Sequence, residues 1–228
     1  MDKDTLIALL EERQDEETFE EAKRVLDAAL ADGEDAGLLL DDGYIHECRG
    51  RASIREAIRW YERSLALDPT IERTRHQLIQ AYAALGETHQ AIELHKQRLA
   101  AAPDDIVEYR CLAHAYLAAG EYEEAGKVVE AGLKLEHDVR LLEQQGSVLA
   151  GRGRPEEALA TWERVSELDD ESISPRYSRA FLLERLGRLT DAAREWETII
   201  AWLREHGYDI QAEWPERELA QLRGVVSE

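Results

Sequence analysis

The chain has 228 residues, of which 44% are hydrophobic, and it carries a formal net charge of −21 at pH 7. This hydrophobic content argues against wholesale disorder. The negative charge disfavours binding to nucleic acid or to an anionic membrane surface, because both carry charge of the same sign. Ala, Leu, Glu and Arg dominate, and no long alternating run of β-branched residues competes with these helix formers. The sequence therefore predicts an all-α fold.

The N-terminal segment, residues 1–37, predicts a degenerate helical pair. Its stretch from Thr18 to Glu21 matches a capping box, in which the hydroxyl and the carboxylate each bond to a backbone N–H. The expected apolar stripe of this pair consists of Leu6, Leu10, Ala22 and Leu26.

The location of the protein is expected to be cytoplasmic. The opening stretch MDKDTLIALLEERQ has acidic residues where a signal peptide needs basic ones, and no stretch is apolar for long enough to span a bilayer. Cys48 and Cys111 fit no metal or redox spacing, which indicates thiols in a reducing compartment.

From residue 38 onward the same pattern returns every 33 or 34 residues. One helix pair cannot bury its apolar face alone, so repeated pairs are expected to stack. A small residue inside each second helix recurs at Ala57, Ala91, Ala125, Ala158 and Ala192. A glycine in the turn between helices recurs at Gly86, Gly120, Gly153 and Gly187.

The copy at residues 72–105 shows how the sequence of one unit predicts two helices and the turn between them. Leu78, Tyr82 and Leu85 form a helical stripe, and a glycine then supplies the backbone freedom that ends the helix. Prolines at 69 and 103 stop the second helices, because proline cannot continue a helix. The expected N-terminal caps are Thr70, Asp105 and a capping box from Ser53 to Glu56.

With its small residue, turn glycine and terminal proline, this helix–turn–helix unit resembles the tetratricopeptide repeat. The resemblance implies a right-handed α-solenoid with repeats at 38–71, 72–105, 106–138, 139–172 and 173–206, followed by a capping helix at 207–228. Residues 38–52 lack the turn glycine, which leaves the register of their helix open by one or two residues. The family's carboxylate clamp of Lys, Asn and Arg is also missing. The matching positions hold Asp42, His46, Gln77, Val107 and Cys111.

No catalytic motif is found in the sequence. The glycines follow the repeat and form no phosphate loop, and neither a nucleophile elbow nor a zinc pattern occurs. Acidic runs are typical of the solvated face of a helix. A metal site that joins His46, His76 and His114 is the alternative to surface histidines, which are more common. We expect no enzyme activity, no cofactor and no metal.

The function is expected to reside on the concave surface, which the first helices of such a stack line. The predicted lining residues gather several cationic or protonatable groups in an acidic protein. They are Arg73, His76, Gln77, Gln80, Arg110, His114, Arg140, Gln144, Tyr177 and Phe181. The predicted function is a non-enzymatic scaffold or adaptor that binds a protein or peptide, with an acidic segment or a free C-terminus as the favoured partner.

Three alternatives stay open at this stage. The lining residues could simply be solvated, and Tyr177 and Phe181 could belong to the core. Trp202 and Trp214 are predicted to cap the stack, but they could instead bind an enzyme, which would make the protein a regulatory or assembly subunit. Self-association through one end of the stack is a further alternative.

Overall fold

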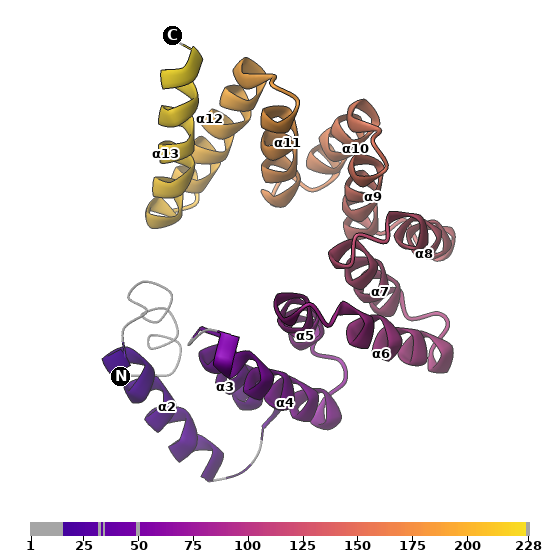
Figure 1. Cartoon of the computed structure of the whole chain (residues 1–228), viewed down its shortest axis with the longest axis vertical. Coiled ribbons are helices and arrows are strands. Elements are labelled where there is room, and N and C mark those ends of the chain that lie inside the picture. Colours follow the sequence, from indigo (N-terminus) through magenta and orange to yellow (C-terminus); the bar gives the residue numbers. More distant parts are fainter. Residues whose placement is uncertain (1–15, 32, 34, 49–50, 227–228) are drawn as a thin grey trace. The chain divides into compact units, whose positions relative to one another are not determined.

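The structure is a computed structural model that describes residues 16–31, 33, 35–48 and 51–226. These residues form helices and no strands (Figure 1), which confirms the all-α prediction. The chain divides into two compact units, Met1–Glu121 and Tyr122–Glu228.

In the first unit, consecutive helices pack against each other in series. The first helix of each pair also contacts the first helix of the next pair, in the order α3, α5, α7. Its described helices are α2 (Glu16–Ala31), α3 (Ala36–Cys48), α4 (Arg51–Leu67), α5 (Glu72–Leu85), α6 (Thr88–Ala101) and α7 (Ile106–Ala118).

The second unit repeats this arrangement, and α13 packs against α12 at its C-terminal end. Its described helices are α8 (Tyr122–Leu135), α9 (Val139–Gly151), α10 (Pro155–Leu168), α11 (Ser174–Arg185), α12 (Leu189–Glu205) and α13 (Asp209–Val226). As predicted for a capping helix, Leu219 and Leu222 of α13 are buried.

The predicted repeat markers occupy the positions that their chemistry requires. The five alanines of the series from Ala57 to Ala192 are all 0% exposed, so no larger side chain has room there. The turn glycines from Gly86 to Gly187 have φ between 71° and 75°, a left-handed conformation that glycine adopts without steric cost. At Gly86, the N–H of the following residue bonds to the carbonyl of Tyr82 at 2.8 Å, which closes the end of α5.

The predicted helix caps are partly wrong. Asp105 caps α7 as expected, since its carboxylate accepts from the backbone N–H of Val107 at 2.9 Å. Thr70 is not a cap, because α5 begins at Glu72 and the Thr70 N–H and hydroxyl both donate to Asp68.

Both predicted capping boxes are also wrong. Helix α2 is already formed at Glu16 and α4 at Arg51, so Thr18 and Ser53 lie inside helices. The residue that caps a helix precedes its first turn and has non-helical backbone angles, so a residue inside the helix cannot act as the cap.

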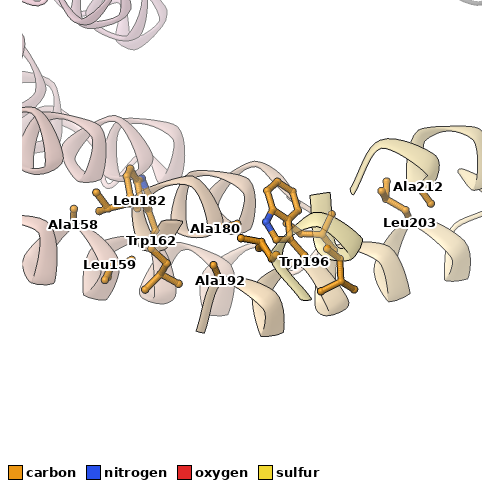
Figure 2. Close-up of a cluster of buried hydrophobic side chains, with 13 residues drawn as sticks. Ala158, Leu159, Trp162, Ala180, Leu182, Ala192, Trp196, Leu203 and Ala212 are labelled. Atoms are coloured by element: carbon orange, nitrogen blue, oxygen red, sulfur yellow. The ribbon is translucent and has the colours of Figure 1, made fainter. Parts of the chain in front are cut away.

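A core of aromatic and aliphatic side chains runs through the second unit (Figure 2). Trp162 and Trp196 are its largest members. Ala158 and Ala192, two of the recurring alanines of the second helices, lie in the same cluster. Gly146 of α9 makes room for Trp162, since a Cβ there would lie 2.3 Å from the indole nitrogen. That nitrogen donates to the carbonyl of Glu143 at 2.9 Å.

The N-terminal part of the first unit has a smaller core. Phe19, Ala22 and Leu26 of α2 pack against Ile45 of α3, which confirms half of the predicted stripe. Leu6 and Leu10 lie outside the described residues. Helix α3 ends at Cys48 and α4 begins at Arg51, and the register of this pair within the repeat stays a prediction.

The division of the chain into five repeats stays a prediction. Four of the five ranges each hold two whole helices, whereas α3 begins two residues before the range 38–71. None of the described helices combines the length and apolarity needed to cross a bilayer. Cys111 is a free, buried thiol, and burial raises its pKa to about 12.

We expect the variant Ala91→Leu to lower the free energy of unfolding by about 1–3 kcal/mol, because the added atoms have no space in a well-packed core. Urea unfolding followed by far-UV circular dichroism measures the effect as a lower midpoint. The control Ala100→Leu changes an exposed position of the same helix and should leave the midpoint nearly unchanged. Equal midpoints for the two variants would show that α6 does not need a small residue at Ala91.

Candidate functional site

Six of the predicted lining residues lie on two neighbouring first helices, α5 and α7. The contacts between these helices form a ladder. Arg110 Nη2 lies 3.1 Å from Glu72 Oε2, and the rings of His76 and His114 stack with their centroids 4.5 Å apart. Glu72, His76 and Gln80 are spaced by four residues, so the three side chains of α5 that contact Arg110 or His114 of α7 lie on one face of the helix. We call the set Glu72, Arg73, His76, Gln80, Arg110 and His114 the α5–α7 strip.

His114 is the most perturbed member of the strip. Its Nε2 lies 2.9 Å from the amide nitrogen of Gln80, which can only donate, so Nε2 accepts and the ring proton is on Nδ1. Burial lowers the pKa of His114 to about 4, with smaller contributions from His76 and His95. The ring is therefore neutral at pH 7 and acts as a fixed hydrogen-bonding group.

Arg73 extends the strip toward α3. Its side chain is exposed, and its guanidinium carbon lies 5.9 Å from the centroid of the Tyr44 ring. Gln77, the remaining predicted residue of α5, is half-buried. The strip thus holds two guanidinium groups and one carboxylate, an excess of positive charge in a protein of net −21.

Beneath the strip lies a buried ion cluster that the sequence analysis missed. Glu108 lies 2.7 Å from His95 Nδ1 and 3.1 Å from Arg75 Nη1, which joins α7 to α6 and α5. His95 itself is fully buried. A sequence signal did exist, because Arg75 and Glu108 fall three and four residues before the buried Leu78 and Leu112, on the apolar stripes of their helices.

The other four predicted lining residues belong to the second unit. Arg140 is exposed and Gln144 half-buried on α9. Because the predicted residues are divided between the two units, their arrangement as one groove stays a prediction.

Tyr177 and Phe181 of α11 join an aromatic cluster with Trp196 and Trp214. Their ring centroids lie 5.7 and 5.4 Å from Trp196, and 6.0 and 5.8 Å from Trp214. These contacts with α12 and α13 give both residues a packing role. Phe181 nevertheless remains 46% exposed.

Trp202 packs differently from Trp214. Its ring stacks on His206 at 4.0 Å, and its indole nitrogen donates to the carbonyl of Asp170 at 3.2 Å. These contacts hold the end of α12 against the loop that precedes α11.

No cluster of three or more potential metal ligands occurs in the described part of the chain. Of the histidines considered for a metal site, His76 and His114 stack on each other. The side chain of His46 lies outside the described residues.

Two family models match the sequence. The model described as anaphase-promoting complex, cyclosome, subunit 3 matches residues 51–132, and that of the tetratricopeptide repeat matches residues 139–164 and 173–198. The structure is similar to the crystal structure of TTC0263, a thermophilic TPR protein of Thermus thermophilus. The TM-score is 0.63 at 22% identity, over 82% of this chain and 98% of that one. The chain is a tetratricopeptide-repeat protein.

Other solved structures share the fold of this tetratricopeptide-repeat protein. A tetratricopeptide repeat protein from Parabacteroides merdae matches with a TM-score of 0.57 at 17% identity, over 96% of this chain and 93% of that one. Yeast Tom70 matches with a TM-score of 0.64 at 17% identity, over 97% of this chain but only 47% of its own. At these identities the likeness shows the fold alone. No curated protein sequence matches the chain significantly.

We expect acid to destabilise the first unit through His114. Its folded-state pKa lies below the unfolded value of 6.5, so the unfolded chain takes up the proton first as the pH falls. The stabilisation is complete above pH 6.5 and is lost toward pH 4. Between pH 7 and pH 5 this amounts to about 2 kcal/mol.

The variant His114→Gln should therefore lose less stability than the wild type over this range, as measured by urea unfolding at each pH. His89→Gln, which changes an exposed histidine of α6, serves as the control and should follow the wild type. Identical pH profiles for wild type and His114→Gln would contradict the assignment.

Proposed function

We propose that this tetratricopeptide-repeat protein is a non-enzymatic scaffold or adaptor that binds an extended acidic segment, or a free C-terminus, on the α5–α7 strip. The observation that carries the proposal is the alignment of Arg73, His76, Gln80, Arg110 and His114 across two adjacent helices. Repeat proteins of this architecture bind partners on surfaces built from successive repeats.

The chemistry of the strip favours a carboxylate partner. A guanidinium group presents several N–H donors in a fixed plane and can bind a carboxylate through two parallel hydrogen bonds. Arg110 is held by Glu72 at 3.1 Å, and His114 is held by Gln80 at 2.9 Å. Side chains that are already positioned lose little conformational freedom on binding, which favours affinity.

The cellular setting of this function is proposed to be the cytoplasm. The buried free thiol of Cys111 supports a reducing compartment, since disulfides are rare there.

The binding test begins with a displayed library of random ten-residue peptides with free C-termini, selected on the immobilised wild-type protein. We expect enrichment of Asp and Glu. The affinity of a selected acidic peptide, measured by fluorescence anisotropy, should weaken at least tenfold in the variant Arg73→Glu/Arg110→Glu. Hydrogen bonds between charged groups are worth about 1.5–3 kcal/mol each, and their loss accounts for such a change. Affinity should also fall as salt rises.

The variant Arg59→Glu/Arg63→Glu is the matched control, since it makes the same change in net charge at exposed positions of α4. It should bind the selected peptide nearly as well as the wild type. Enrichment of basic or purely apolar peptides, or equal loss in both variants, would refute binding at the strip.

A second candidate function is that of a regulatory or assembly subunit that binds an enzyme through α13. Ile210 and Trp214 lie one turn apart on this helix and are 67% and 39% exposed, and Trp214 contacts the exposed Phe181. Neighbouring exposed apolar side chains of this kind mark interaction sites in many proteins.

For this candidate we expect Ile210→Glu to abolish a stoichiometric complex recovered from native lysate by affinity purification. A charge placed in an apolar interface would have to be buried without a partner. The adjacent exposed residue provides the control Gln211→Glu, which adds the same charge and should retain the complex. Retention of every partner by Ile210→Glu would exclude α13 as the interface.

A further inference from the structure

The second unit contains two hollows, one on each side of helix α10, that no part of the proposed function uses. The larger is a cavity of about 410 Å³ between α10 and α12, with Arg179 and Leu183 of α11 among its lining. The smaller is a slot of about 180 Å³ between α9 and α10, lined in part by Leu142 and Val165. Ala160 of α10 is exposed and borders both hollows.

The charges that line the cavity almost cancel. It is lined by three arginines and four acidic residues. Most of these charges are already paired within the wall, since Arg188 lies 3.0 Å from Asp191 and 3.2 Å from Glu156. A ligand with a full charge of either sign would therefore meet like charges as well as opposite ones.

The ion pair between Arg179 and Glu195 lies in the wall of the cavity. Arg179 Nη2 lies 3.0 Å from Glu195 Oε1. Both side chains keep a small exposed fraction, 17% for Arg179 and 13% for Glu195, so a group in the cavity can reach them. Burial raises the pKa of Glu195, and the nearby Arg179 opposes this rise.

We propose that the two hollows form a docking site for an extended peptide segment that places an Asn or Gln carboxamide in the cavity and an apolar side chain in the slot. The segment crosses α10 at Ala160, where the small side chain lets the peptide backbone approach.

A carboxamide matches the cavity better than a charged group does. It offers an acceptor for Arg179 and donors for Glu195 and carries no net charge, whereas an ammonium group only donates and a carboxylate only accepts. The cavity volume falls within the usual range of about 300–1,000 Å³ for ligand sites. In an extended segment, residues i and i+2 point to the same side about 7 Å apart, which suits two hollows that share one bordering residue.

This site is independent of the α5–α7 strip, because its residues all belong to the second unit and it selects for a dipole instead of a charge. If acidic peptides fail to bind the α5–α7 strip, the proposal for the two hollows still stands. If the probes fail to bind the hollows, the proposal for the strip still stands.

The test uses three synthetic probes, acetyl-Leu-Ala-Gln-amide and its counterparts with Glu or Lys in place of Gln. Each is titrated into the isotope-labelled full-length protein and followed by two-dimensional amide NMR, which detects binding even in the millimolar range. We expect saturable shifts around Ala160, Leu183 and Glu195 with the Gln probe. The Glu and Lys probes should bind at least fivefold more weakly.

The variant Ala160→Arg should abolish the shifts, since a long side chain at this exposed helical position covers both hollows without entering the core. The control Ala201→Arg adds the same charge at an exposed position of α12 and should leave binding intact. Equal affinity for the three probes would overturn the proposed carboxamide preference. Absence of saturable shifts, or shifts that persist in Ala160→Arg, would overturn the site.

Discussion

The close approach of paired helices at a buried alanine is the constraint on which the rest of this structure depends. An isolated helix pair cannot cover its apolar face. The fully buried alanines that recur in the second helices, such as Ala91 and Ala158, let neighbouring helices approach closely. The turn glycines hold the backbone in the left-handed conformation that returns it for the next helix. With the backbone arranged in this way, the outward positions of the helices are free to vary.

The buried alanines and the turn glycines were predictable because each position restricts the type of a single residue. Only glycine adopts a φ near 75° without strain, and only a small side chain fits where helices touch. The caps were less predictable because several residues compete for the same backbone groups. Thr70 matched the preference for a hydroxyl cap, but the Asp68 carboxylate accepts both its N–H and its hydroxyl within the turn.

The candidate site shows the same limit of sequence reasoning. Spacing placed His76 and His114 on corresponding faces of two helices, and the structure brings their rings into contact. Spacing also placed Arg75 and Glu108 on apolar stripes, but their charge obscured that signal. The structure shows that Glu108 contacts both Arg75 at 3.1 Å and His95, 13 residues earlier in the chain, at 2.7 Å. The hollows beside Ala160 arise from four helices together, so no single stretch of sequence predicts them.

The two proposed binding surfaces would select partners by different physics. The α5–α7 strip attracts through net charge, a force that salt screens over about 8 Å at physiological ionic strength. The cavity beside α10 has nearly balanced charges, so its selectivity comes from the direction of donors and acceptors at short range, which salt affects little. A partner with an acidic segment and a neutral polar segment would therefore lose the first contact, but keep the second, as salt rises. Once such a partner is bound at the cavity, its binding at the α5–α7 strip becomes an intramolecular step. The overall affinity then rises without any new residue at the strip.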